Sequence, residues 1–177
     1  RGASEQGRRD IAMLRQLLFE LASTRLRITT PYFAPDEVVL AALLGAAERG
    51  VQVQLLVPGG NNDKEVAQLA TERHYRRLLD AGIEIHVFRP TMLHAKVTTV
   101  DGHLAVVGSA NLNHRSLQHD EEVDVVLFDP GPVATLDGHT DADLRRSARI
   151  TTDDLDAAAR TARGPLRALT GLVSRWT

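Results

Sequence analysis

Apolar positions along the first half of the chain switch between the 3.6-residue period of helices and the short apolar runs of strands. Ile11, Leu14, Leu18 and Leu21 recur at helical intervals, which predicts an amphipathic helix near the start. Glycines close two further helical patterns, and prolines end the strand runs. The predicted order is helix 8–23, strand 25–33, helix 37–50, strand 51–58, helix 64–82 and strand 83–90.

The rest of the pattern predicts strands that follow one another without helices between them. A hairpin covers residues 92–116, a strand follows at 121–129, and the segment 130–138 is predicted as a loop. Strands that alternate with helices indicate a parallel sheet, whereas consecutive strands usually pair antiparallel. We therefore predict an α/β fold over residues 1–150, with a mixed β-sheet flanked by helices on both faces.

Residues 151–177 are predicted to form a separate, basic amphipathic tail. From residue 157 onward this tail carries arginines and no acidic residue, with leucine, valine and tryptophan among them. Such a segment can lie on an anionic membrane surface. The alternative is a terminal helix that docks on its own domain and turns its basic face to solvent.

Composition and charge limit the classes of function. The chain has 177 residues and a net charge of −2, whereas a dedicated duplex-DNA binder usually has a clear basic excess. It has no cysteine, which excludes disulfides and thiolate metal sites. No apolar run approaches the roughly 18 residues that span a bilayer, so we expect this segment to be soluble. No signal peptide opens the chain. Because its first residue is Arg1, we expect it to be a segment of a longer protein.

The hairpin gathers polar side chains on one predicted face. Asp101-Gly102 is a strong signal for a two-residue turn, and with that turn His94 lies directly opposite Ser109. Because side chains alternate along strands, Lys96 and Asn111 then share their face. Each residue alone has an ordinary structural explanation, since buried polar groups are usually just hydrogen-bonded. Their combination favours a reaction centre.

These residue types suit phosphodiester chemistry without a metal or another cofactor. A neutral imidazole such as that of His94 can attack phosphorus and form a phosphohistidine. Lys96, Ser109 and Asn111 provide charge and hydrogen-bond donors for the phosphoryl oxygens. A second group must protonate the leaving alcohol and then activate the incoming one, and a carboxylate such as Glu122 can fix the tautomer of a catalytic imidazole.

Asp101 lies in the predicted turn, away from the other polar groups. It lies seven positions after His94, which at ~3.3 Å per residue is too far for direct chemistry. We therefore expect Asp101 to have a structural role.

The pattern HxKx4D at residues 94–101, followed by GSxN at residues 108–111, resembles the signature of the phospholipase D superfamily. "TPYFAPDE" (30–37), "GSANLNHRS" (108–116) and "DEEVDVVLFD" (120–129) are similar to the second catalytic half of bacterial cardiolipin synthases. The resemblance covers roughly residues 10 to 130. It implies a catalytic group of His94, Lys96, Asp101 and Glu122, and substrate-binding residues Ser109, Asn111, Arg115 and Tyr32.

The resemblance also implies a reaction and partners. The family transfers a phosphatidyl group between phospholipids through a phosphohistidine intermediate, and by analogy with two-motif members His94 would be the proton carrier. The longer protein would work at the cytoplasmic face of a membrane. The family's active centre needs two such motifs and this chain has one, so the second would come from an upstream segment or from a homodimer partner.

Two other functions stay open on the sequence. The chain could be a homodimeric nuclease or general phosphodiesterase of the same superfamily, with nucleic acid as its substrate. It could also be a non-catalytic half that only binds phosphorylated ligands, although that function predicts a damaged motif and this motif is intact.

Overall fold

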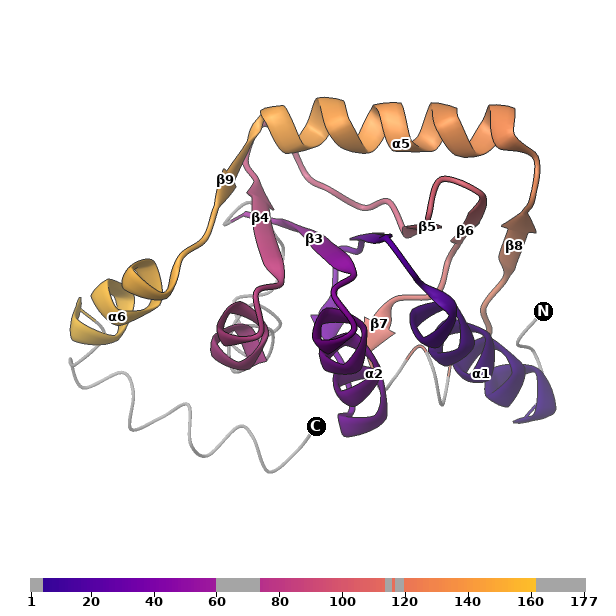
Figure 1. Cartoon of the computed structure of the whole chain (residues 1–177), viewed down its shortest axis with the longest axis horizontal. Coiled ribbons are helices and arrows are strands. Elements are labelled where there is room, and N and C mark those ends of the chain that lie inside the picture. The colour runs from indigo at the N-terminus through magenta and orange to yellow at the C-terminus, as the bar shows by residue number, and fades with distance from the viewer. Residues whose placement is uncertain (1–4, 60–73, 114–115, 117–119, 162–177) are drawn as a thin grey trace.

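A seven-stranded sheet lies between two layers of helices (Figure 1). The computed structural model describes residues 5–59, 74–113, 116 and 120–161. The strands are β1 Arg25–Thr29, β2 Phe33–Ala34, β3 Gln52–Pro58, β4 Glu84–Phe88, β5 Val97–Val100, β6 Leu104–Gly108, β7 Leu112–Asn113, β8 Asp124–Leu127 and β9 Ser147–Arg149. The helices are α1 Glu5–Leu21, α2 Glu37–Glu48, α5 Pro130–Arg145 and α6 Thr152–Thr161, and residues 74–80 are the described part of another helix.

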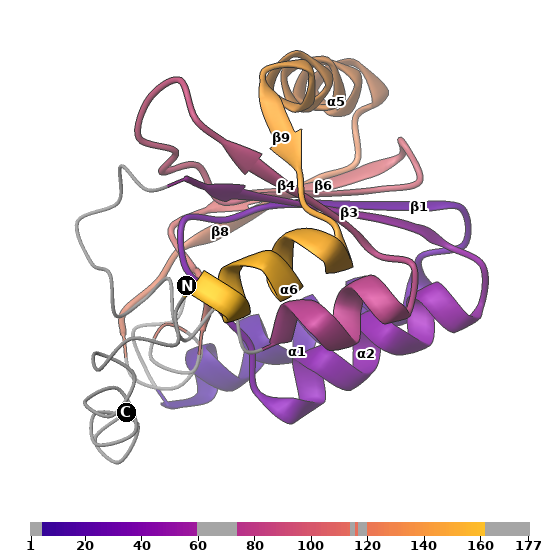
Figure 2. The ribbon, with the colours of Figure 1, turned by 90° about the vertical axis from the view of Figure 1, so that its left-hand side faces the viewer.

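The sheet is mixed, as the sequence predicts. Its strand order is β8-β6-β5-β1-β3-β4-β9. The strands β1, β3 and β4 are parallel, whereas β5, β6 and β8 form an antiparallel group and β9 pairs antiparallel with β4. Helix α5 lies over one face of the sheet, and α1, α2 and α6 lie over the other (Figure 2). The predicted α/β fold with helices on both faces is therefore confirmed.

The boundaries of α2 show how local sequence sets the parallel part of the fold. The Asp36 side chain accepts a hydrogen bond from the backbone N–H of Val39 at 2.9 Å, which caps the helix start. Gly50 follows the helix end with φ of 84°, a conformation that favours glycine. The chain then enters β3, whose Val53 and Leu55 are buried in the core between the sheet and α2.

Helix α1 buries most of the stripe that its apolar spacing predicts, but not its last leucine. Ile11, Leu18 and Phe19 are buried, whereas Leu21 is 62 % exposed. The buried stripe also contains Arg15, which is only 2 % exposed. Leu21 departs from the predicted stripe at the last residue of the helix.

The segment 130–138, predicted as a loop, is instead the beginning of α5. The Asp129 side chain accepts a hydrogen bond from the Gly131 N–H at 2.9 Å and caps the helix. Pro130 follows at the first helical position, where its missing N–H is tolerated because that group would have no partner within the helix. The prediction was wrong because proline and glycine here start a helix and do not interrupt one.

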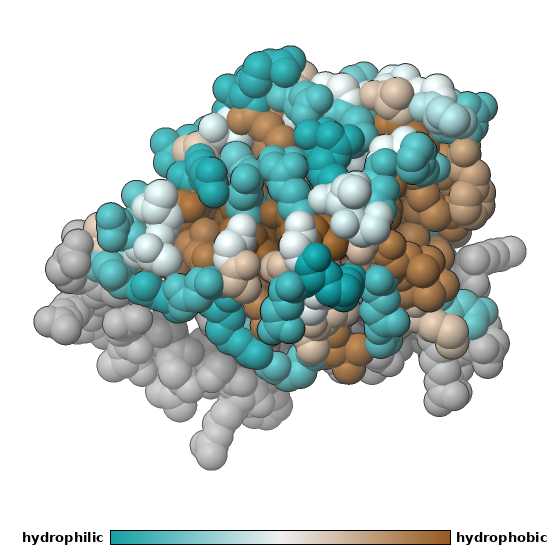
Figure 3. All heavy atoms as spheres, viewed as in Figure 1, coloured by the Kyte–Doolittle hydropathy of each residue, from teal (hydrophilic) through white to brown (hydrophobic). Residues whose placement is uncertain are grey.

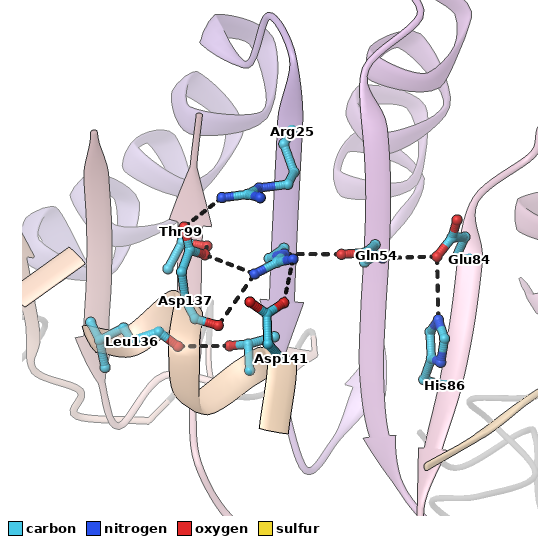
Figure 4. A network of polar contacts seen from close by, with 10 residues as sticks. Arg25, Gln54, Glu84, His86, Thr99, Leu136, Asp137 and Asp141 are labelled. Carbon is cyan, nitrogen blue, oxygen red and sulfur yellow. Dashed lines mark hydrogen bonds and ion pairs between the residues drawn. The ribbon is translucent and has the colours of Figure 1, made fainter. Parts of the chain in front are cut away.

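A polar network attaches α5 to the sheet (Figure 4). Arg25 and Arg27 of β1 both form ion pairs with Asp137 of α5, with N–O distances of 2.6 and 3.3 Å. Arg27 also contacts Asp141 at 2.6 Å, and Thr99 of β5 donates to Asp137 at 2.7 Å. The helix is therefore held on a polar face of the sheet by charges as well as by its buried Val133.

The hairpin register differs by one residue from the predicted one. Asp101 and Gly102 have φ of 52° and 72°, as a two-residue turn requires, and the His103 N–H donates to the Val100 carbonyl at 3.0 Å. However, Val100 pairs with Leu104 and leaves His103 as an extra residue. A slip of one residue exchanges the two faces of a strand, so the predicted polar face was wrong.

The slip does not disperse the polar residues, because they lie beyond the regular strands. The strand β5 begins at Val97 and β6 ends at Gly108, so His94, Lys96 and Ser109 are in the adjoining segments. The predicted strand 25–33 is also divided, since β1 ends at Thr29 and the buried Pro31 precedes β2.

The predicted tail begins as α6. Leu155 packs against the main core, and Asp156 forms an ion pair with Arg76 of the helix described at 74–80. Residues 162–177, which carry most of the predicted basic and apolar tail positions, lie outside the described residues. In the part of the chain that the structure describes, no helix is long and apolar enough to cross a bilayer.

Candidate functional site

His94 and Lys96 lie next to each other at the start of β5. The Lys96 Nζ is 3.0 Å from His94 Nδ1 and donates to the His94 carbonyl oxygen at 2.8 Å. The His94 side chain is exposed, whereas Lys96 is only 8 % exposed. The pair therefore presents an accessible imidazole with a partly desolvated ammonium beneath it.

The segment that carries His94 is anchored on one side by a small apolar cluster. Leu93 is 6 % exposed and packs with Leu56, Phe88 and Leu144. The sequence analysis does not predict that Leu93 anchors the segment of His94, although an apolar residue directly before a histidine in a loop can indicate such an anchor. Because Leu93 points into this cluster, its neighbour His94 is turned toward solvent.

The Tyr32 ring lies close to the His94 imidazole. The ring centroids of Tyr32 and His94 are 6.3 Å apart and the ring planes meet at 87°, an edge-on contact. Tyr32 is half-buried, as expected for a residue at the wall of a site.

The small sheet of β2 and β7 places Asn111 in the same region. Phe33 pairs with Leu112, and both are 1 % exposed. Tyr32 and Asn111 directly precede these two paired residues, so the two anchored strands bring them side by side. The candidate phosphate-binding amide is thus held near the ring that contacts His94.

Asn111 has an unsatisfied polar atom. Its Nδ2 donates to the Ser116 hydroxyl at 3.1 Å, while its buried Oδ1 has no hydrogen-bond partner among the described residues. A half-turn of the amide would exchange the two atoms, let the Ser116 hydroxyl donate to Oδ1, and leave the N–H₂ group free. In that orientation Asn111 can donate to a phosphoryl oxygen.

Ser109 and Glu122 form a short contact between the end of β6 and the start of β8. The Ser109 hydroxyl donates to Glu122 Oε2 at 2.5 Å and accepts from the Val123 N–H at 2.9 Å. Glu122 is 7 % exposed. The hydroxyl proton of Ser109 is therefore engaged by Glu122 and not directed at a ligand.

Electrostatics link Lys96 with Glu122. Burial lowers the pKa of the Lys96 ammonium, and the negative charge of Glu122 opposes that effect without cancelling it. The net result is a lysine that loses its proton more readily than an exposed one. The pKa of Lys96 therefore depends on how deeply its ammonium is buried and on how close it lies to Glu122.

Gly108 explains how β8 approaches this site. A Cβ atom at this position would lie 2.0 Å from Asp124 Oδ1 and 2.2 Å from the Val123 carbonyl oxygen. Only glycine permits this contact, because any side chain would push β8 away. The glycine of the GSxN pattern therefore brings Glu122 within reach of Ser109.

Asp101 lies at the opposite end of β5 from Lys96 and contacts a different part of the chain. Its carboxylate accepts hydrogen bonds of 2.7 to 2.9 Å from the backbone N–H groups of Ser23, Thr24 and Arg25 and from the hydroxyls of Ser23 and Thr24. Burial alone would raise the pKa of Asp101, but the donors from Arg25, Thr24 and Ser23 hold it well below its usual range. These contacts join the hairpin to the connection between α1 and β1.

The structure therefore brings together most of the residues that the sequence points to. His94, Lys96 and Tyr32 form one group, with Ser109 and Glu122 beside it. Arg115 lies outside the described residues. Within the described ranges, no group of three or more histidine, aspartate or glutamate residues could hold a metal ion.

Comparisons with known proteins agree with this geometry. The chain is 37 % identical over 138 residues to a probable cardiolipin synthase, YwiE, of Bacillus subtilis, an alignment that covers 76 % of this chain and 27 % of that protein. It is 39 % identical over 137 residues to cardiolipin synthase A of Pseudomonas aeruginosa, covering 77 % of this chain and 28 % of that protein. The chain thus spans little more than a quarter of the length of these curated relatives.

Solved structures share the fold. Nuc of Salmonella typhimurium, described as a phospholipase D family member, superposes with a TM-score of 0.70 at 21 % identity, over 80 % of this chain and 91 % of that one. Phosphatidylserine synthase of Haemophilus influenzae superposes with a TM-score of 0.67 at 19 % identity, over 80 % of this chain and 37 % of that one. The profile of the family described as "Cardiolipin synthase, PLD-like domain" matches residues 16–144, which is more than half of the chain. The chain therefore belongs to the cardiolipin synthase, phospholipase D-like domain family.

Proposed function

We propose that this chain supplies one half of the active site of a phosphatidyltransferase of the cardiolipin synthase type, which acts on phospholipids at a membrane surface. The observation that carries the proposal is the pairing of an exposed His94 imidazole with the buried Lys96 ammonium 3.0 Å away. The identity of 37 to 39 % to two cardiolipin synthases supports this choice of substrate class.

The proposed reaction has two steps. In the first, a histidine nitrogen attacks the phosphorus of a phosphatidyl donor, the bond from phosphorus to the head-group oxygen breaks, and a second histidine gives its proton to the leaving oxygen. In the second, that histidine removes the proton of an acceptor hydroxyl, which attacks the phosphohistidine and releases the enzyme. The new phosphodiester replaces the old one, and no net proton is gained or lost.

His94 takes the proton-carrying role in this proposal, by analogy with two-motif members of the family. Its exposed ring suits it for exchange with two different alcohols. Lys96 provides the positive charge for the non-bridging phosphoryl oxygens, and the free amide N–H₂ of Asn111 provides a donor. Glu122 supports the site through Ser109 and through its charge beside Lys96.

A second motif must complete the site, from an upstream segment of the same protein or from a second copy. The outer edge of β8 supports such an arrangement. Val125 in this edge strand and its neighbours Val123 and Phe128 just outside it are 52 %, 52 % and 71 % exposed, and the two valines lie within three residues of Glu122. Figure 3 shows hydrophobic residues gathered on the side of the molecule where β8 lies. Exposed apolar clusters of this kind commonly mark interaction sites.

The experiment is a transfer assay with the native full-length protein and phosphatidylglycerol vesicles. We expect His94→Asn to abolish cardiolipin formation, and the matched variant His103→Asn, at an exposed position in the hairpin turn, to keep it. Undiminished cardiolipin formation by His94→Asn would refute the proposal. Cleavage of single-stranded DNA in the presence of a chelator, without lipid transfer, would replace it with the nuclease function.

A further inference from the structure

Arg15 is a fully buried charge in the middle of the apolar face of α1. It is 2 % exposed and lies between the buried Ile11 and Leu18. An unpaired charge in such a position would be strongly destabilising, so a buried arginine is tolerated only when its donors are satisfied. The residues that satisfy Arg15 therefore indicate what it is for.

The guanidinium contacts three separate segments. Its Nε and Nη2 both donate to the same carboxylate oxygen, Asp124 Oδ2, at 3.1 and 2.8 Å. Its Nη1 lies 2.9 Å from the Thr98 hydroxyl, and Nη2 lies 3.5 Å from the Ala110 carbonyl oxygen. The side chain of Asp124 is 2 % exposed, so this ion pair is shielded from water on both sides.

Each of these contacts lies one or two residues from a candidate site residue. Thr98 follows Lys96 by two positions, and Asp124 follows Glu122 by two positions. In extended chain, residues two apart share a face and are about 6.6 Å apart. Ala110 lies between Ser109 and Asn111. One side chain is therefore bonded to all three segments that carry the candidate phosphate-handling residues.

Two of these segments have weak attachments of their own. The strand β8 is at the edge of the sheet and pairs with β6 only on one side. The short β7, which follows Ala110, pairs with another two-residue strand. The hydrogen bonds from Arg15 of α1 therefore contribute more to the position of these two segments than they would to that of a strand in the middle of the sheet.

We propose that Arg15 is a positioning residue for phosphoryl transfer, which sets the distances between Lys96, the segment around Asn111, and Glu122. Arg15 does not touch the substrate in this proposal. Its planar guanidinium donates hydrogen bonds to all three segments and so holds them at fixed distances from one another. The inference rests on the proposed function. The match to the family profile begins at Gln16, the residue after Arg15.

The test uses four variants of the native full-length protein. Arg15→Met removes the guanidinium. Arg15→Lys keeps a positive charge but not the two guanidinium donors that bond to Asp124. Arg15→Met combined with Asp124→Asn also removes the carboxylate charge that would be left unpaired. The matched control is Arg27→Met. Arg27 is also buried and also pairs with two carboxylates, but on the face of the sheet under α5.

We expect the double variant to recover most of the Tm that Arg15→Met loses, because the buried charge is no longer left without a partner. It should still have a kcat 10- to 100-fold below that of the native protein at similar KM, since misplacement of catalytic groups by about 1 Å commonly costs a factor of this order. The kcat of Arg15→Lys should lie between that of the native protein and that of the double variant. Arg27→Met should lose Tm without a comparable loss of kcat.

A second readout does not need turnover. Titration of the Lys96 side chain by NMR, with labelled lysine, should show the pKa of Lys96 moving in the double variant and staying unchanged in Arg27→Met, because only the former changes how Lys96 is buried beside Glu122. If the native protein forms no cardiolipin, this readout still tests Arg15. A double variant with native kcat and an unchanged Lys96 titration would overturn the inference, as would an equal loss of kcat in Arg27→Met.

Discussion

Replacing Asp101 separates a structural role from a chemical one for the third residue of the HxKx4D pattern. The carboxylate accepts five hydrogen bonds from residues 23–25, three from backbone N–H groups and two from hydroxyls. Asp101→Asn keeps one acceptor oxygen and tolerates φ of 52° at this position. We therefore expect the variant to fold with reduced stability.

The magnitude follows from the contacts. If the amide oxygen takes the place of Oδ1, the variant loses the two contacts that Oδ2 makes with Ser23. Since these contacts are solvent-exposed, each contributes about 0.5 kcal/mol, and loss of the negative charge adds about as much again, which gives roughly 1 to 2 kcal/mol. For Asp101→Ala all five contacts are lost and a left-handed backbone strains the alanine, so we expect about 3 to 4 kcal/mol.

The pH dependence has a definite sign. Because the native pKa of Asp101 lies below its usual range, the stabilisation by its charge is complete above about pH 5 and is lost progressively as the pH falls below about 4. Urea denaturation of the native protein and Asp101→Asn should therefore give free energies of unfolding that converge in acid.

The activity of Asp101→Asn shows whether the Asp101 carboxylate takes part in the chemistry. Measured well below Tm, the kcat of Asp101→Asn should stay within about threefold of the native value, since the carboxylate is at the far end of β5 from Lys96. A variant with native stability and a kcat more than 100-fold lower would show that Asp101 takes part in the chemistry.

Three further predictions concern the site itself. Gly108→Ala should displace the start of β8, because a Cβ would lie 2.0 Å from Asp124 Oδ1, and we expect a loss of about 3 kcal/mol or more in chemical denaturation together with lost transfer activity; native stability in this variant would contradict the close approach. Lys96→Arg should move the basic limb of the pH–rate profile to higher pH, because burial lowers the pKa of Lys96 while arginine stays protonated. If the basic limb does not move, deprotonation of Lys96 is not the cause of the fall in rate at high pH. Leu93→Ala removes a side chain that is 6 % exposed and should cost about 2 to 4 kcal/mol and raise KM and lower kcat by loosening His94; unchanged kinetics in a destabilised variant would show that the small cluster does not orient His94.

The parallel part of the fold could be predicted because its local signals agree with its tertiary structure. Asp36 caps α2, Gly50 follows the helix end, and the apolar run of β3 is buried. The loop predicted at 130–138 was wrong for the opposite reason. Proline and glycine occur both in loops and at helix starts, and only the capping contact of Asp129 with Gly131 decides between them.

The sequence predicts a set of candidate site residues, whose roles stay predictions, but it does not predict their geometry. The residue types of His94, Lys96 and Asn111 indicate phosphate chemistry whatever the register. The predicted pairing of His94 with Ser109 was wrong because the turn takes up His103 as an extra residue, which the Asp-Gly signal does not reveal. Likewise no sequence pattern shows that a charged position in the apolar stripe of α1 reaches three distant segments, since that contact depends on tertiary packing.

The most direct test of the central claim is to follow the phosphatidyl group on the protein during turnover. Full-length protein is quenched while it converts phosphatidylglycerol vesicles, and mass spectrometry searches for a phosphatidyl adduct on histidine. We expect an adduct on the histidine of the motif that completes the site, and no cardiolipin formation by His94→Asn. Cardiolipin formed at the native rate by His94→Asn, with no histidine adduct in the native protein, would contradict it.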